Sequence, residues 1–422
     1  MARGADGLKR NPPERPGTAM SSPNAEAKRP RDPRLDVFRG AGMIIILIAH
    51  IPGNAWADWI PARFGFSDAT EIFVFCSGCA SALAFGRVFE IAGWARGTAR
   101  ILYRVWQVYW AHIGVFAAVV AALALADAKL GGQYLRHDLN LWPFLDDPAR
   151  MLLGLVTLTY VPNYFDILPM YLVILALIPA IMAAKSVGRG TVAAVSVTLY
   201  VLAFARLLDL PAEPWSDRVW FFNPFSWQLL FFLGFAFGRG WLIPPGYDRR
   251  LALLSLAVIA AALPFSCQYG WSCFAGWGAM PWLGEAHQAL SPLIDKTHLA
   301  PMRVAHFLGL AYLAYTLAGE GGRRLKGSLV PAVRLVGRQT LAVFLAGLVL
   351  AQVLGVVLDV IGRSFFTAAL VNLGGCLVLF AVAAACEWFK SSPWLHARAQ
   401  ASARHTAPAV MAEPTQTVPQ HP

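Results

Sequence analysis

Ten long runs of apolar residues alternate with short polar segments between residues 37 and 386. Each run has about 17 to 25 residues, the length at which an α-helix crosses a hydrocarbon core of about 30 Å. The runs lack a strand's alternation, and a backbone that faces lipid must satisfy its own hydrogen bonds. The pattern therefore predicts an all-α, polytopic membrane protein with about ten transmembrane helices. These helices are expected over residues 37–53, 69–89, 105–127, 164–184, 190–208, 222–238, 250–267, 302–319, 340–361 and 364–386, with 149–162 as an interfacial or re-entrant piece.

Both ends of the chain differ from this apolar middle. Residues 1–35 are rich in Pro, Arg, Lys and Ser and lack the apolar core of a signal peptide, while residues 391–422 are mostly polar. We expect disordered cytosolic tails over 1–35 and 391–422, the first of them basic, and one membrane domain over 36–390. With 57% hydrophobic and 14% charged residues, the chain is more apolar than a soluble domain requires.

The positive charges fall mainly on one side of the predicted helices. If the N-terminus is cytosolic, the segments on that side hold 26 of the 35 lysines and arginines. This asymmetry predicts that both termini are cytosolic, because cytoplasmic loops carry the excess of Lys and Arg. Contact with an anionic inner leaflet then explains the net charge of +11, and no nucleic-acid partner is expected.

Six cysteines are scattered along the chain, and none has metal-ligand spacing with histidine, so no metal site is expected. Four of them lie within predicted helices, where they are expected to be small packing residues. Cys267 and Cys273 flank the outer end of the seventh run, where a disulfide is chemically permitted. The sequence leaves this bridge open, because it does not give the Cα separation.

The first run, RLDVFRGAGMIIILIAHIPGN, carries one histidine among aliphatic residues. On a helix, Arg39 and His50 would be separated by about 16.5 Å along the axis, which places His50 beyond mid-bilayer and toward the outer face. An ionisable group at this depth is costly and is therefore usually functional. At the inner end, Arg34, Asp36 and Arg39 are candidate substrate contacts or, alternatively, an inner-leaflet anchor with a local ion pair.

The second run opens with FSDATEIFVFCSG, in which Ser67 suits a helix N-cap. Asp68 and Glu71, three residues apart, would share one face of the first turn. They are expected at the depth of His50, where a carboxylate would orient the imidazole and raise its basicity. The two acids could instead be ordinary first-turn residues that the helix dipole favours.

Further polar residues gather at the outer ends of the predicted helices. Amides, acids and bases occur there beside several tryptophans, and such a surface suits a sugar, which needs fixed hydrogen bonds and apolar faces for stacking. Taken singly, each could be an ordinary polar residue at a loop or helix end. The candidate substrate-binding residues of this set are Asn54, Asn163, Asp166, Asn223, Gln228, Lys296, His298 and Arg303.

Three arginines on the inner side are candidates for binding a nucleotide-bearing donor. Arg100 and Arg104 follow the second run, and Arg338 precedes the ninth. Guanidinium groups bind phosphates through paired hydrogen bonds. The excess of positive charge on the cytosolic side explains the same residues without any ligand.

With these residues in place, the chain resembles the OpgC family of bacterial inner-membrane proteins, which succinylate osmoregulated periplasmic glucans, within the wider acyltransferase-3 group. Members of that wider group are similar mainly through an N-terminal arginine, here Arg39 or Arg34, and the downstream His50. The segments that carry the resemblance are RDPRLDVFRG followed by HIPGN, FSDATEIFVFCSG, PNYFDILPMY, FNPFSWQLLF, DKTHLAPMRVAHFLGLAYL and GRQTLAVF.

The resemblance implies transfer of an acyl group from a cytosolic acyl-CoA, first of all succinyl-CoA, to a hydroxyl of a periplasmic glucan. Acyl-CoA would be a co-substrate, and no bound cofactor is implied. His50 would act as general base, with Glu71 or Asp68 orienting its second nitrogen.

Two other readings stay open: an O-acetyltransferase that acts on another surface glycan, and a solute or lipid transporter. The extra carboxylate of a succinyl donor needs only one cation, for which Lys296, Arg303 and Arg218 qualify. An oxyanion could be stabilised by Asn163, Asn223 or Lys296. A transporter would be expected to have helices broken by Gly or Pro in corresponding halves. The oligomeric state is left open.

Overall fold

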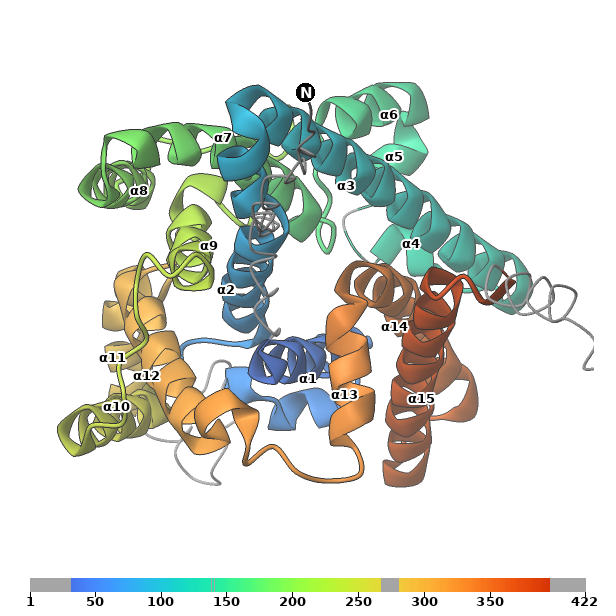
Figure 1. The fold of residues 1–422 in the computed structure, drawn as a ribbon. Coiled ribbons are helices and arrows are strands. Elements are labelled where there is room, and N and C mark those ends of the chain that lie inside the picture. Colours follow the sequence, from blue (N-terminus) through green and yellow to red (C-terminus); the bar gives the residue numbers. More distant parts are fainter. Residues whose placement is uncertain (1–31, 138, 140, 267–280, 395–422) are drawn as a thin grey trace, which may run out of the picture. The chain divides into compact units, whose positions relative to one another are not determined.

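The computed structural model describes residues 32–137, 139, 141–266 and 281–394, and Figure 1 shows their helices in chain order. Within these ranges the structure is helical, with β-pairing limited to one isolated bridge between Pro211 and Val219. The all-α prediction is therefore confirmed for this part of the chain. Cys267 and Cys273 and most of both predicted tails lie outside the described residues.

The α-helices are α1 Pro33–His50, α2 Ala69–Ser81, α3 Arg87–Leu130, α4 Tyr134–His137, α5 Trp142–Asp146, α6 Pro148–Thr157, α7 Ile167–Val187, α8 Arg189–Phe204, α9 Pro224–Gly238, α10 Arg249–Ala262, α11 Pro281–Ile294, α12 Pro301–Ala318, α13 Val330–Arg338, α14 Thr340–Ile361 and α15 Phe365–Lys390. Short 3₁₀ turns are η1 Ala55–Trp59, η2 Pro61–Arg63, η4 Leu263–Phe265 and η6 Glu320–Gly322, and η3 Ala82–Gly86 is a π-helix.

Helices occur in all ten predicted ranges. Among the described residues, four helical segments are long and apolar enough to cross a membrane, and α6, α8 and α9 are shorter apolar helices. This composition is that of a membrane protein. The four long segments are Ala69–Leu130, Ile167–Val187, Thr340–Ile361 and Phe365–Lys390.

The second and third predicted helices are joined without a loop. α2 continues through the π-helical turn η3 into α3, which has 44 residues. The helical path is broken at Gly93, whose φ of 82° is a left-handed value that favours glycine. The polar residues that we expected in an inner loop after residue 89 therefore lie on the first half of α3.

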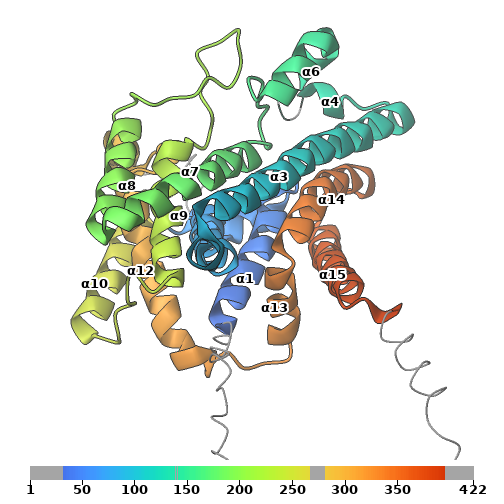
Figure 2. The ribbon, with the colours of Figure 1, turned by 45° about the horizontal axis from the view of Figure 1, so that its top comes forward.

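Among the described residues, four helices fall outside the predicted ranges, namely α4, α5, α11 and α13. The nine residues of α13, VPAVRLVGR, are too few and too polar to form a span by themselves. They form a helix because their apolar residues pack against α1, beside which α13 lies in Figure 2. The segment 149–162, expected to be interfacial or re-entrant, contains α6, which ends at Thr157.

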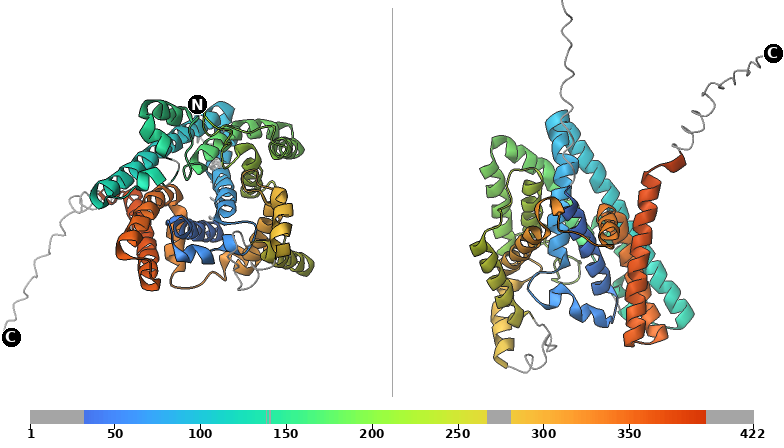
Figure 3. Two further views of the ribbon diagram at one scale, coloured as in Figure 1. Left: turned by 180° about the vertical axis from the view of Figure 1, so that it is seen from behind. Right: turned by 60° about the horizontal axis from the view of Figure 1, so that its bottom comes forward.

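Glycines let the backbones of α1 and α13 touch. A Cβ atom added to Gly40 would lie 1.9 Å from the carbonyl oxygen of Val333, and one added to Gly337 would lie 1.8 Å from that of Asp36. Small residues at a crossing permit this close approach between helices in membranes. α1 also contacts α2, α14 and α15, and Figure 3 shows it among them from two further sides.

The same arrangement joins α2 to α9. A Cβ atom on Gly78 would lie 1.9 Å from the carbonyl oxygen of Phe231, and one on Gly234 would lie 2.1 Å from that of Phe75. α2 therefore lies between α1 and α9. Its first turn lies at the same level as His50, the last residue of α1. The two crossings fix the elements that carry most of the predicted site.

We expect Gly78→Ala to destabilise the protein, because the methyl group meets a backbone carbonyl that cannot move without displacing α9. Overpacking of this kind costs about 1 to 3 kcal/mol. Gly374→Ala in α15 is the matched control, since nothing lies within 4 Å of its Cβ position. Thermal unfolding in detergent should give a lower Tm for Gly78→Ala alone; equal Tm values for the two variants would contradict the crossing.

Candidate functional site

Two acids and two bases form a buried cluster between the first turn of α2 and the start of α12. Arg303 donates from Nε to Glu71 Oε1 at 2.8 Å and from Nη2 to Asp68 Oδ2 at 3.2 Å. Lys296 Nζ donates to Asp68 Oδ2 at 2.6 Å. Glu71 is fully buried and Arg303 is 8% exposed. The sequence named all four residues, and the structure brings them together as a charge-balanced group.

Asp68, and not Ser67, is the N-cap of α2. Its Oδ1 accepts from the amide of Thr70 at 2.7 Å, while Glu71 Oε2 accepts from the amide of Asp68 at 2.8 Å, which completes a capping box. Burial opposes the charge of Asp68, but Lys296 and Arg303 hold the pKa of its carboxyl well below the usual range. This stabilisation is present above the usual carboxyl pKa and is lost only at strongly acidic pH.

A second polar cluster fixes the segment before α12. His298 bonds through Nδ1 to Asp295 Oδ2 at 2.6 Å and through Nε2 to Asp209 Oδ1 at 2.8 Å. Asn223, the N-cap of α9, donates to the same Asp209 oxygen at 2.8 Å. His298 and Asn223 therefore lock loops together, and Asp209 was not found from the sequence.

Another histidine, His306 of α12, contacts Ser67, the residue just before the N-cap of α2. Its Nδ1 lies 2.7 Å from Ser67 Oγ and accepts from the Ser67 amide at 3.3 Å. A backbone amide only donates, so Nδ1 is an acceptor and the proton of the neutral ring is on Nε2. Ser67 thus holds α12 instead of capping α2.

His50 is the last residue of α1, and its Nδ1 lies 2.7 Å from the carbonyl oxygen of Ile46. A carbonyl only accepts, so Nδ1 carries hydrogen, and in the neutral ring Nε2 is left with a lone pair. The expected bond from Glu71 or Asp68 to His50 is not formed: that part of the prediction is wrong, because both acids are engaged by Arg303. The charges that act on the ring are those of Lys296 and Asp68.

Tyr164 lies against His50 and completes its surroundings. The two rings are 5.2 Å apart and meet edge to face. The hydroxyl of Tyr164 donates to the carbonyl oxygen of Leu348 in α14 at 2.7 Å, which fixes the phenol ring. His50 is an exposed residue, although surrounding protein atoms partly desolvate its ring. Tyr164 was missed from the sequence because nothing marks it among the other aromatic residues.

Two amides of the predicted set have structural partners. Asn54 exchanges hydrogen bonds of 2.8 Å with Asn372 of α15, and both are buried. Gln228 accepts from Ser196 Oγ at 2.8 Å and donates to its carbonyl oxygen at 2.7 Å, which joins α9 to α8. Hydrogen bonds of this kind between helices satisfy polar groups that lipid cannot. Neither Asn54 nor Gln228 forms a hydrogen bond with His50.

Asn163 and Asp166 flank Tyr164 in the chain and lie near Arg218. Arg218 donates to Asn163 Oδ1 at 3.3 Å, and its other nitrogen bonds Glu213 Oε2 at 3.0 Å and the Val161 carbonyl at 2.6 Å. Asp166 is buried at the N-cap of α7, and its Oδ1 has no hydrogen-bond partner among the described residues. Arg218 is thus committed to local contacts.

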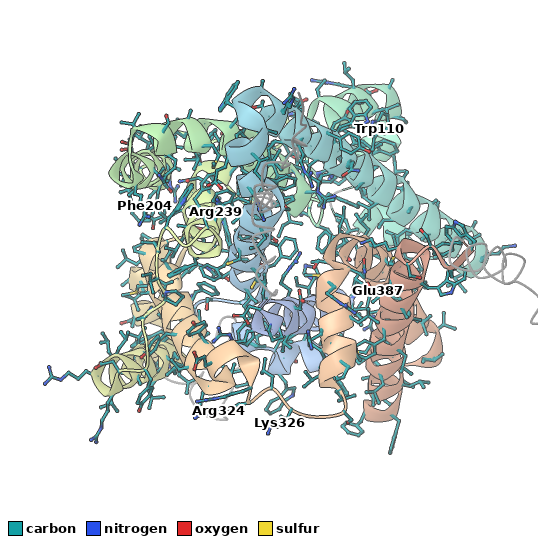
Figure 4. All side chains as sticks on the ribbon, viewed as in Figure 1. Trp110, Phe204, Arg239, Arg324, Lys326 and Glu387 are labelled. Atoms are coloured by element: carbon teal, nitrogen blue, oxygen red, sulfur yellow. The ribbon has the colours of Figure 1, made fainter. Side chains whose placement is uncertain are left out.

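Of the predicted inner residues, Arg100 and Arg104 lie on α3 and Arg338 lies on α13. Arg100 lies over Phe85 at 5.9 Å, Arg104 donates to Gln107 at 3.2 Å, and Arg338 pairs with Glu387 at 3.2 Å, the last of which Figure 4 labels. Each of the three has a local contact of its own. On α1, Arg34 lies over Tyr315, Asp36 is buried at the crossing with α13, and Arg39 is partly buried.

We expect Arg303→Met to lower the free energy of unfolding by about 3 to 5 kcal/mol, because it leaves two carboxylates in a buried site with only Lys296. Arg338→Met, which breaks an exposed pair with Glu387, is the matched control and should cost at most about 1 kcal/mol. Denaturation in detergent micelles gives both values. Similar losses in the two variants would show that the buried cluster does not support the fold.

Within the part of the chain that the structure describes, no three His, Cys, Asp or Glu residues gather as a metal-binding group. The cluster, the accessible His50 and the membrane helices together describe a site at one end of α1. No curated protein and no solved structure matches the chain. The family model described as OpgC protein matches residues 31–391, which is most of the chain. Family membership indicates an acyltransferase that modifies glucans, and the chain belongs to the OpgC family.

Proposed function

We propose that this protein is an inner-membrane O-succinyltransferase that moves a succinyl group from cytosolic succinyl-CoA to hydroxyls of periplasmic glucans. The proposal includes ten transmembrane helices with both termini in the cytosol, as the distribution of Lys and Arg predicts. Acyl-CoA acts as a co-substrate, with no resident cofactor. In this topology the inner end of α1 lies at the cytosol and His50 lies toward the periplasm.

The observation that carries the proposal is the state of the His50 ring. The bond from Nδ1 to the Ile46 carbonyl supplies the tautomer in which Nε2 is a base, without any carboxylate. The ring is accessible, is held by Tyr164 and ends a helix that starts on the opposite side of the membrane domain. A general base needs this combination of a free lone pair, a fixed ring and access to substrate.

In the proposed step, Nε2 of His50 takes the proton of a glucan hydroxyl while its oxygen attacks the thioester carbonyl. The carbon–sulfur bond then breaks, the imidazolium returns the proton to the leaving thiolate, and the products are a succinate ester and free CoA. The hydroxyl oxygen becomes the ester oxygen, the thioester sulfur leaves as the thiol of CoA, and His50 returns to its neutral form. General base catalysis of this kind contributes about 10² to 10⁴ in rate.

Lys296 is the cation best suited to the carboxylate of the succinyl group. Arg303 is buried between Asp68 and Glu71, and Arg218 is held by Glu213 and Asn163. Lys296 has one carboxylate partner, is 29% exposed and acts on His50 through its charge. A cation at this place would favour a succinyl over an acetyl donor by charge pairing.

His50→Gln should lower glucan succinylation by about 10² or more while leaving folding intact, because the side chain loses its base. His287→Gln is the matched control, since His287 also bonds a carbonyl oxygen through Nδ1, that of Phe265. The assay is mass spectrometry of periplasmic glucans from cells that express each variant at equal level. Near-normal succinylation by His50→Gln would refute the base assignment.

Lys296→Met should raise the KM for succinyl-CoA about tenfold and change the KM for acetyl-CoA little, whereas Lys296→Arg should keep the preference. Initial rates with both donors in reconstituted membranes separate these outcomes. Equal effects on the two donors would remove Lys296 from the recognition of the carboxylate. Acetyl esters on the glucans of producing cells would instead support the O-acetyltransferase reading, and uptake of a solute without acyl-CoA would support a transporter.

A further inference from the structure

A pocket of about 630 Å³ opens beside the first turn of α1, at the end opposite His50. This volume lies within the range of small-molecule sites, about 300 to 1,000 Å³. Its lining combines cations with aromatic rings, which distinguishes it from the apolar gaps between membrane helices. The charged and aromatic residues of the lining are Arg34, Tyr247, Tyr315, Glu320, Arg323 and Arg324.

Arg34 and Tyr315 form a fixed wall of the pocket. The guanidinium carbon of Arg34 lies 4.0 Å from the centre of the Tyr315 ring, and its Nη1 donates to the carbonyl oxygen of Gly319 at 3.0 Å. Arg34 is only 9% exposed. Stacking and the carbonyl bond hold the guanidinium in place, so its charge is positioned before any ligand arrives.

Tyr247 presents an aromatic ring to the pocket. The residue is 75% exposed, yet the backbone on either side is anchored. The hydroxyl of Tyr312 donates to the carbonyl oxygen of Gly246 at 3.0 Å and accepts from the amide of Asp248 at 2.8 Å. An uncovered ring on an anchored backbone is a surface on which a nucleobase can stack.

Arg323 and Arg324 complete the pocket after the glycine-rich turn that ends α12. Both are exposed, and within the described ranges neither has a carboxylate partner. Figure 4 shows Arg324 below the end of α12. Their side chains pack on Gly319, whose φ of 75° favours glycine. Glu320 is the one acid of the lining, so three arginines leave a net charge of about +2 for an anion.

We propose that this pocket binds the nucleotide end of the acyl donor, with its base on Tyr247 and its phosphates at Arg34, Arg323 and Arg324. The inference rests on the proposed function and assigns the donor phosphates to residues that share one cavity, in place of Arg100, Arg104 and Arg338. Arginine and phosphate form paired, charge-assisted hydrogen bonds. In the proposed topology the pocket faces the cytosol, where acyl-CoA is found.

The distance to His50 fits such a donor. Arg34 and His50 are 16 residues apart on α1, about 24 Å at 1.5 Å per residue. The pyrophosphate, pantetheine and succinyl parts of the donor form a chain of about 20 bonds, which extends about 25 Å at about 1.25 Å per bond. A nucleotide held in the pocket can therefore bring its thioester to His50.

The test measures binding of CoA and of 3′-dephospho-CoA to the full-length protein in nanodiscs of zwitterionic lipid. The double variant R323A/R324A should bind CoA at least tenfold more weakly, and removal of the 3′-phosphate should weaken binding to the wild type more than to the variant. R249A/R250A, at the exposed start of α10 and outside the pocket, is the matched control. Tyr247→Ala should also weaken binding, and Tyr247→Phe should retain it.

An unchanged Kd for CoA in R323A/R324A would overturn the proposal. So would wild-type protein that binds no CoA but is stabilised, through the same arginines, by an anionic phospholipid added to the discs. Binding is measured without acceptor, so it is independent of turnover. If CoA binding depends on the arginines but the protein transfers no succinyl group, the transferase is refuted and the pocket is supported. If the variant transfers succinyl groups normally with an unchanged KM, the pocket is refuted and the transferase is supported.

Discussion

The structure depends on the pairing of charges that lipid cannot solvate. An unpaired buried ion costs several kcal/mol, so Arg303 inside the membrane domain requires both Glu71 and Asp68. The pairing ties α12 to the first turn of α2, and the capping box gives Asp68 and Glu71 their positions. Lys296 joins the same group from the segment before α12. Ion pairs thus join the first turn of α2, the segment before α12 and the start of α12.

This constraint also separates two roles that the sequence assigned to one pair of acids. Asp68 and Glu71 are consumed by the cations, and His50 obtains its tautomer from the helix backbone at Ile46. The arrangement leaves the ring close to charged groups without a direct bond to any of them. In the proposed reaction the ring exchanges a proton with the substrate while the ion pairs that support the fold stay unchanged.

The helices could be predicted from the sequence because apolar runs of sufficient length have few alternatives to the helix. α13 could not, since its nine residues form a helix only by packing on α1. Of the site, the sequence identified His50, Asp68, Glu71, Lys296 and Arg303 as polar residues in costly positions. It could not assign their partners, because pairs such as Asp68 with Lys296 are 228 residues apart. Asp209 and Tyr164 carry no local signal at all.

The backbone contact between α1 and α13 has a consequence for how material passes through the protein. At Gly40 and Gly337 the backbones of the two helices are in direct contact. A carrier that alternates its opening must let its helices slide or rock. The backbone contact between α1 and α13 leaves no room for these two helices to move past each other. In the proposed reaction the flexible arm of acyl-CoA would carry the acyl group along α1 while the helices stay in place.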